Sequence, residues 1–145
     1  MLSTRLASKG AGKNYLYRFD VDLNQNFVKK AHVTEDEWKT GKYPGASHCD
    51  ELPYIFKTGP DTNIDSPAIE SKEFEMIKTM VDTFTSFAES GDPNNSRLKK
   101  WETVNEASLQ GMNINENGSK MMEFPENSRI KVWNEIFKKE NVALY

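Results

Sequence analysis

The chain has 145 residues, of which 37% are hydrophobic and 28% charged, and its mean hydropathy is −0.74. The net charge is −3 and the basic residues lie in scattered pairs, so we expect neither nucleic acid nor an anionic membrane surface as a partner. No apolar run approaches the length of a transmembrane helix. The length suits one domain, but the low apolar content predicts a piece of a larger fold.

The first predicted elements are the end of a helix and a strand. Leu2 and Leu6 lie four residues apart, and glycines follow, so residues 1–12 have the pattern of the last turns of a helix. A domain rarely begins there, which adds to the expectation of a fragment. Residues 15–21 are rich in aromatic and β-branched side chains, which predicts a strand of a core sheet.

Residues 20–24 begin like a calcium-binding EF-hand loop. Such a loop needs glycine at its sixth position and glutamate at its twelfth, where this chain has Gln25 and Ala31. We therefore predict no calcium site. His32 lies in the polar stretch 24–42, where we expect it to be solvent-exposed and without a chemical role.

The segment 43–56 is the strongest candidate for a functional site. It reads Tyr-Pro-Gly-Ala-Ser-His-Cys-Asp-Glu-Leu-Pro-Tyr-Ile-Phe. The small residues before His48 allow a tight turn and a close approach of the backbone to its neighbours. We expect the apolar residues after the two acids to be buried and to hold the loop; these are Leu52, Tyr54, Ile55 and Phe56. This mounting favours a chemical role for His48 over a structural one.

A long amphipathic helix is predicted after a turn-rich loop at 57–67. Its apolar residues recur three and four positions apart: Phe74, Ile77, Met80, Val81, Phe84, Phe87 and Ala88. We expect Phe84 and Phe87 to face the core. Gly91, followed by Asp92-Pro93, predicts the end of this helix.

The last predicted elements are a hairpin and a second amphipathic helix. Asn117-Gly118 between residues 109–114 and 120–124 is a strong hairpin signal. The final helix carries Ile130, Trp133, Ile136 and Phe137 on one face. We expect Trp133 to be buried against the sheet. Lys138-Lys139 in its last turn suits the helix dipole.

The histidine segment resembles that of the type-B carboxylesterases, the cholinesterase-like branch of the α/β-hydrolases. The matching residues are Gly45, Ala46, His48, Asp50, Glu51, Leu52, Pro53, Tyr54 and Phe56. Cys49 stands where the family usually has a small residue. The resemblance implies an α/β fold, in which His48 is the general base and acid of a Ser-Glu-His triad. It implies no cofactor.

Further matches follow in the family's order. The Tyr-x-Tyr-x-Phe strand precedes the histidine segment, and residues 84–94 resemble the family's Trp-Thr-Asn-Phe-Ala-x-x-Gly-Asn/Asp-Pro-Asn run, with departures at Phe84 and Ser86. Phe124-Pro125 follows the hairpin as in related esterases. The resemblance runs from about residue 10 to about 137 and implies that residues 1–145 are the C-terminal part of one carboxylesterase domain.

The sequence lacks the other parts of such an active site. It contains no Gly-x-Ser-x-Gly elbow and no His-Gly-Gly-Gly oxyanion motif. Ser47 and Cys49 flank His48, but the side chains of adjacent residues in an extended loop point apart. A contact from His48 to Asp50 or Glu51 stays open, although in the family these acids shape the loop. Loss of a triad serine or histidine costs about 10⁶ in kcat, so we expect the isolated chain to be inert.

The sequence therefore predicts an α/β-hydrolase fragment with a few strands, a terminal hairpin and two amphipathic helices. Its function by resemblance is hydrolysis of a small carboxylic ester, in the full-length form, with His48 as the general base. The single cysteine favours an intracellular member of the family. Two alternatives stay open: a non-catalytic remnant that binds a partner or an ester, and an unrelated small α+β domain.

Overall fold

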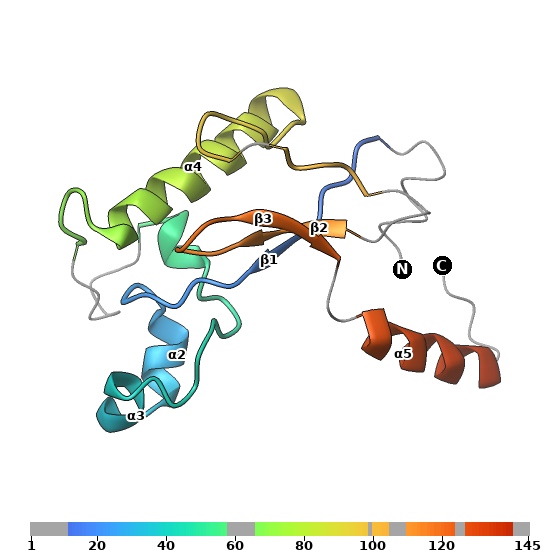
Figure 1. Cartoon of the computed structure of the whole chain (residues 1–145), viewed down its shortest axis with the longest axis horizontal. Coiled ribbons are helices and arrows are strands. Elements are labelled where there is room, and N and C mark those ends of the chain that lie inside the picture. The colour runs from blue at the N-terminus through green and yellow to red at the C-terminus, as the bar shows by residue number, and fades with distance from the viewer. Residues whose placement is uncertain (1–11, 58–65, 99, 105–109, 124–126, 141–145) are drawn as a thin grey trace. The chain divides into compact units, whose positions relative to one another are not determined.

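The computed structural model describes residues 12–57, 66–98, 100–104, 110–123 and 127–140 (Figure 1). The helix end predicted for 1–12 and the Phe-Pro pair at 124–125 fall outside these ranges, except for Gly12. The chain divides into two compact units, and the boundary between them falls within two of the strands. The first unit comprises the described parts of 1–18, 100–113 and 120–145, and the second those of 19–99 and 114–119. No helix in the described ranges is long and apolar enough to cross a membrane.

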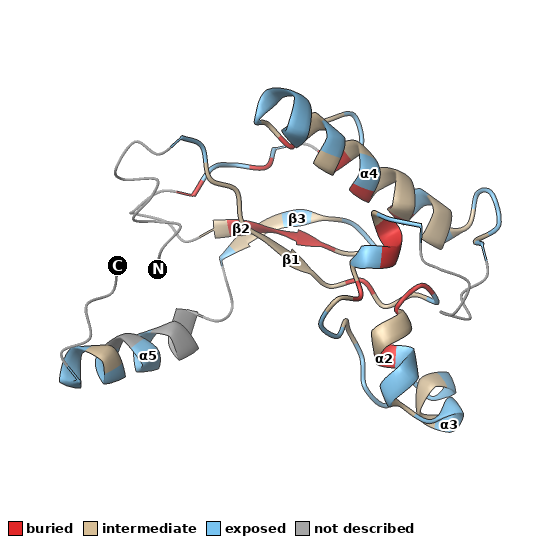
Figure 2. Ribbon diagram, turned by 180° about the vertical axis from the view of Figure 1, so that it is seen from behind, coloured by how far each residue is buried: buried red, intermediate tan, exposed pale blue. Residues whose placement is uncertain are grey.

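Three strands form one sheet in the order β1-β2-β3. They are β1 (Tyr17–Phe19), β2 (Gln110–Ile114) and β3 (Lys120–Glu123). β2 pairs antiparallel with β3 through a tight turn in which the Gly118 N–H donates to the Asn115 carbonyl at 3.1 Å. The hairpin predicted from Asn117-Gly118 is confirmed. The central strand β2 is buried along most of its length (Figure 2).

In the first unit, aromatic side chains pack around Trp101. The ring centroids of Tyr15 and Tyr17 lie 6.0 and 6.1 Å from that of Trp101, both edge-on, which is a favourable arrangement for aromatic pairs. Trp101 is only 5% exposed. The predicted aromatic strand therefore forms, although its regular part is shorter than the predicted 15–21.

In the second unit, helix α4 (Lys72–Ser90) packs on a short 3₁₀ helix, η1 (Leu52–Tyr54). Its buried side chains lie on one ridge and are Met76, Met80 and Thr83. The Ser71 hydroxyl accepts a hydrogen bond from the Phe74 N–H at 3.1 Å and begins the helix. Gly91 ends it with a φ of 72°, a left-handed conformation that suits glycine, so the predicted stop is confirmed.

Two predictions of buried aromatic residues are wrong. Phe87 is 46% exposed, because the buried ridge of α4 ends at Thr83, one turn earlier, while Phe84 is half-buried. Trp133, on helix α5 (Asn127–Lys139), is 58% exposed. Its ring centroid lies 6.1 Å from that of Phe137 on the same helix. The apolar side chains Val132, Trp133 and Ile136 of α5 thus lie at the surface of the described chain.

The stretch 24–42, predicted only as polar, contains two short helices. They are α2 (Phe27–His32) and α3 (Glu35–Lys39). Helices this short show no apolar periodicity, but α3 begins with a capping box between Thr34 and Glu37. That spacing of Thr and Glu was the available sequence signal.

Candidate functional site

The histidine loop, defined as residues 43–56, reverses direction around His48. The backbone has positive φ at Gly45 (91°) and Cys49 (68°), and the Asp50 N–H donates to the Ser47 carbonyl at 3.2 Å. A positive φ is accessible to glycine and uncommon for other residues. The loop therefore turns on either side of His48, which is exposed.

Asp50 fixes one side of this turn. Its side chain is completely buried, and its Oδ1 accepts from the backbone N–H groups of Val28 and Lys29 at 2.9 and 3.1 Å. Its Oδ2 accepts from the Ser47 N–H at 2.7 Å. A carboxylate at the first turn of a helix satisfies free N–H donors and complements the helix dipole. Asp50 therefore shapes the loop, as the family resemblance implies, and ties it to α2.

A clamp of three residues fixes the other side. The Gly45 N–H donates to Asp22 Oδ2 at 2.9 Å, and the Lys29 ammonium donates to the Gly45 carbonyl at 3.0 Å. Lys29 also forms an ion pair with Asp22 Oδ1. Both backbone polar groups of Gly45 are thus held by side chains from the segment that follows β1.

Tyr54 anchors the end of the loop. Its side chain is buried, its hydroxyl donates to Asn26 Oδ1 at 2.8 Å, and Asn26 Nδ2 donates to the Val21 carbonyl at 2.7 Å. Burial is the main cause that raises the pKa of Tyr54, with nearby carboxylates adding to it, so the phenol stays protonated and remains a donor. The Tyr54 ring also packs on Phe19 of β1, with centroids 5.3 Å apart.

The predicted burial of the apolar residues after the acids is confirmed for Tyr54 only. Leu52 and Phe56 are exposed, Phe56 by 64%, and Ile55 is half-buried. The reason is η1, because a 3₁₀ helix turns about 120° per residue and spreads successive side chains around its axis. Pro53 is buried beside Tyr54 in place of the two flanking residues.

His48 itself is exposed, and among the described residues its ring has no hydrogen-bond partner, Asp50 and Glu51 included. Ser47 is exposed and Cys49 is half-buried. The structure thus builds a supported turn under His48, while the described part of the chain brings no nucleophile or acid to the ring. His32 is also exposed, as predicted, with its Nδ1 2.7 Å from the Val28 carbonyl.

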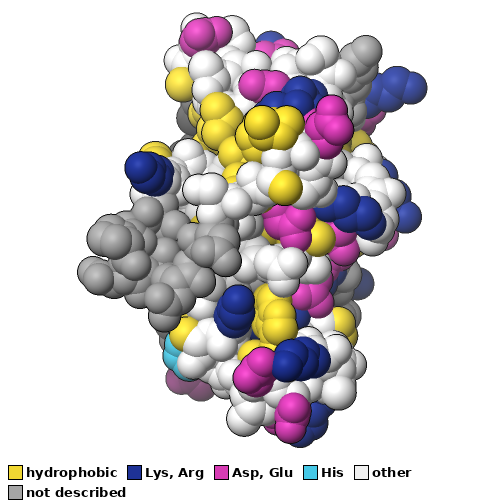
Figure 3. Space-filling view, turned by 90° about the vertical axis from the view of Figure 1, so that its left-hand side faces the viewer, with side chains coloured by type: hydrophobic (Ala, Val, Ile, Leu, Met, Phe, Trp, Pro, Cys, Tyr) yellow, Lys and Arg dark blue, Asp and Glu magenta, His cyan; other side chains and the backbone are white. Residues whose placement is uncertain are grey.

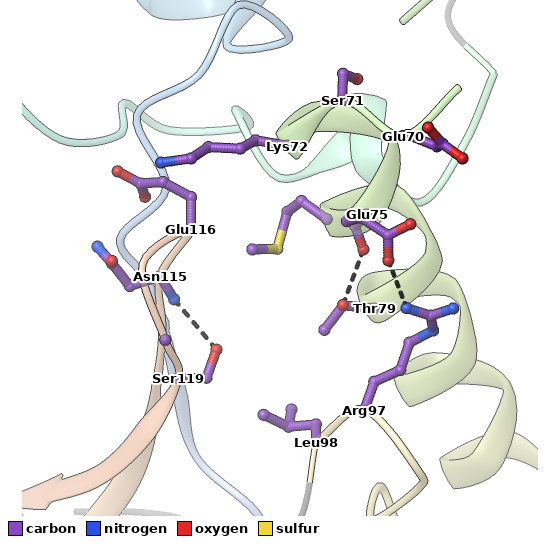
Figure 4. Close-up of a pocket in the computed structure, with 12 residues that line it drawn as sticks. Glu70, Ser71, Lys72, Glu75, Thr79, Arg97, Leu98, Asn115, Glu116 and Ser119 are labelled. Carbon is purple, nitrogen blue, oxygen red and sulfur yellow. Dashed lines mark hydrogen bonds and ion pairs between the residues drawn. The ribbon is translucent and has the colours of Figure 1, made fainter. Parts of the chain in front are cut away.

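A polar cavity of about 330 Å³, which no sequence pattern indicated, lies between the start of α4 and the hairpin turn (Figure 4). The two cations that line it already have partners within the chain. Arg97 bonds to Glu75 and Asp82, each at 2.8 Å, and Lys72 donates to Asn117 at 3.1 Å. His48 does not line this cavity. In the described residues, no group of three His, Cys, Asp or Glu side chains is placed to hold a metal ion.

The comparisons with known proteins agree on one family. The model of the carboxylesterase family matches residues 2–133. Esterase B1 of Culex pipiens is 26% identical over 137 residues, covering 90% of this chain and 24% of that protein. Juvenile hormone esterase of Tribolium castaneum is 34% identical over 111 residues, 73% of this chain and 17% of the relative.

Solved structures give the same fold. Juvenile hormone esterase from Manduca sexta, with OTFP covalently attached, superposes with a TM-score of 0.75 at 20% identity, over 94% of this chain and 25% of that one. Carboxylesterase EST55 of Geobacillus stearothermophilus gives 0.63 at 20% identity, over 90% and 24%. The chain thus spans about a quarter of the length of these structures, and the predicted α/β-hydrolase class is confirmed. The chain belongs to the carboxylesterase family.

Proposed function

We propose that this chain is the C-terminal, histidine-bearing part of a serine carboxylesterase that hydrolyses small carboxylic esters, with His48 as the general base. One observation carries the proposal beyond family membership. The turn under His48 is held at buried Asp50 and at Gly45, while the imidazole itself stays exposed. A rigid mounting with an accessible ring is what a proton-transferring group needs when its partners come from other polypeptide.

In the proposed reaction, neutral His48 removes the hydroxyl proton of a serine as its oxygen attacks the ester carbonyl. The imidazolium then returns that proton to the leaving alcohol, which gives an acyl-enzyme. A water molecule, deprotonated by the same imidazole, attacks the acyl group, and the proton passes back to the serine oxygen. The serine, the triad acid and the oxyanion donors belong to polypeptide outside these 145 residues.

The residues around His48 support this assignment of roles. Asp50 accepts three backbone N–H groups, and no hydrogen bond joins it to the imidazole, so this carboxylate supports the loop and does not orient the ring. Ser47 precedes His48 in the chain, and its backbone N–H donates to Asp50 Oδ2. Neither residue is arranged as the acid or the nucleophile of a local triad.

A chimeric enzyme tests the proposal. Residues 1–145 replace the matching quarter of the Manduca sexta juvenile hormone esterase, and hydrolysis of 4-nitrophenyl acetate is measured. We expect His48→Ala to lower kcat by about 10⁴- to 10⁶-fold relative to the parent chimera. His32→Ala, the matched control at the chain's second histidine, is expected to leave kcat within about twofold. Retention of most activity by the His48→Ala chimera would refute the assignment.

A non-catalytic binding module is the second candidate, favoured by the exposed apolar side chains around the loop. Phe56 and Tyr43, at its two ends, are both more than half exposed. Large exposed apolar side chains are typical of interaction surfaces. A folded parent chimera that binds the ester but shows no turnover would support this candidate over the esterase.

A further inference from the structure

Lys29 is the least expected charged residue in the core of the second unit. Its side chain is 8% exposed, although lysine is almost never buried unless its ammonium is paired. Three groups surround the ammonium: the Asp22 carboxylate, the Gly45 carbonyl at 3.0 Å and the Trp38 ring, whose centroid is 5.2 Å away. From the sequence, residues 24–42, which include Lys29, were predicted only to be polar.

The three partners come from three different segments. Asp22 follows β1, Trp38 belongs to α3, and Gly45 is part of the histidine loop. A single buried cation therefore joins the end of a strand, a helix and the loop. Without its positive charge, the ion pair, the hydrogen bond to Gly45 and the cation–π contact would be lost together.

Gly45 connects Lys29 and its partners to the turn that carries His48. Its N–H is held by Asp22 and its carbonyl by Lys29, so the peptide planes on both sides of its left-handed backbone are fixed. Asp50 fixes the loop two residues after His48. The turn that carries the imidazole is thus suspended between two buried supports, and Lys29 holds one of them.

We propose that Lys29 is a positioning residue for His48, acting through Gly45. The catalytic meaning of this role rests on the proposed esterase function, whereas the role itself is a property of the loop. Lys29 touches neither His48 nor any reacting group, so its loss should loosen the histidine loop without abolishing the fold of α4 or the hairpin.

Amide hydrogen exchange measured by NMR on the 145-residue chain tests this. In Lys29→Met, which keeps the side-chain length and removes the charge, we expect the Gly45 amide to exchange at least about tenfold faster relative to the Met80 amide in α4. Lys29→Arg, which keeps the charge, should restore at least half of this protection. Lys42→Met, which removes an exposed lysine paired with Glu37, is the matched control and should leave the Gly45 amide unchanged.

The comparison with Met80 separates positioning from general destabilisation, because a purely structural role would accelerate both amides equally. If Lys29→Met does not fold, Asp22→Asn removes the charge of the ion pair with less disturbance and should also accelerate Gly45 selectively. A Gly45 amide without protection in the unsubstituted chain, equal acceleration at Gly45 and Met80, or no change in either variant would overturn the proposal.

The same substitution in the chimeric esterase connects positioning with catalysis. We expect Lys29→Met to lower kcat at least about tenfold with KM within twofold, because the loop presents the base and not the substrate-binding surface. If the Gly45 amide exchanges selectively faster but kcat is unchanged, the positioning role of Lys29 stands and the result counts against His48 as the base. Equal loosening of both amides would refute the positioning role alone.

Discussion

At the scale of single residues, the histidine loop depends on buried polar groups that are hydrogen-bonded to one another and to the backbone. Asp50 accepts three backbone hydrogen bonds, and Tyr54 and Asn26 form a chain of two that ends at Val21. Buried polar groups stabilise a conformation when all their bonds are made and cost free energy when a partner is removed. The loop's conformation is therefore set by buried side chains other than that of His48.

Replacing Asp50 with alanine should be strongly destabilising. The N–H groups of Val28, Lys29 and Ser47 would lose their acceptor, and we expect the free energy of unfolding to fall by about 2–4 kcal/mol. Urea denaturation measures the change. Asp36→Ala, at an exposed acid in the neighbouring helix, should change it by less than about 0.5 kcal/mol. Equal stability of the Asp50→Ala variant would contradict this account of the loop.

The candidate site could be predicted from the sequence only in part. The small residues and acids around His48 lie within fourteen positions and form a recognisable local pattern. The partners that hold the loop do not, since Asp22 and Lys29 are separated from Gly45 by 23 and 16 residues. Asp22 belonged to the sequence that resembled a calcium loop, and nothing in the sequence indicated that it would bind a backbone N–H group instead.

At the scale of elements, helix ends and the hairpin turn could be predicted because their signals are local. Gly91 and Gly118 both have a positive φ, a backbone conformation that few other residues adopt. The exposure of Phe87 and Trp133 could not be predicted, because periodicity shows which side of a helix is apolar and not whether another segment covers that side. The short helices α2 and α3 gave too few residues for periodicity.

Gly91→Ala tests the end of α4. With a φ of 72° and open space around the position of a new Cβ, the penalty comes from backbone strain alone. We expect a loss of about 1 kcal/mol in the free energy of unfolding, and a smaller loss for Gly91→Asn, since asparagine tolerates this conformation. Thermal denaturation compares the two variants. An alanine variant as stable as the parent would show that α4 ends differently in solution.

The start of α3 predicts an unusual titration. Hydrogen bonds from Lys42 and Thr34 lower the pKa of the exposed Glu37 carboxyl to about 2. Because the folded value is depressed, the stabilising effect is present above the ordinary value of about 4.3 and is lost as the pH falls toward 2. A carbon-detected NMR titration should give a pKa near 2, and Lys42→Met should raise it. A value above 4 in the unsubstituted chain would contradict the hydrogen bonds from Lys42 and Thr34 to Glu37.

At the scale of the whole molecule, the described chain covers its apolar side chains incompletely. On the face shown in Figure 3, hydrophobic side chains reach the surface among acidic and basic ones. The exposed apolar residues include Phe56, Phe87 and Trp133, on three different elements or loops. A chain that spans a quarter of its relatives' length would have such surfaces if other polypeptide covered them.

Trp101 and Trp133, two of the three tryptophans, make this testable. Trp101→Ser removes a side chain that is 5% exposed and should cost about 3–5 kcal/mol. Trp133→Ser removes one that is 58% exposed and should cost less than about 1 kcal/mol. Urea denaturation of both variants gives the comparison. Similar losses in the two would show that Trp133 is covered in solution.

The central claim is that His48 is a general base whose reacting partners lie outside this chain. Its most direct test is the rate at which the purified 145-residue chain hydrolyses 4-nitrophenyl acetate, measured beside its His48→Ala variant. We expect equal rates, both at the background of a protein without an elbow serine. Turnover by the unsubstituted chain that disappears in His48→Ala would contradict it, because the 145 residues would then hold a complete catalytic site.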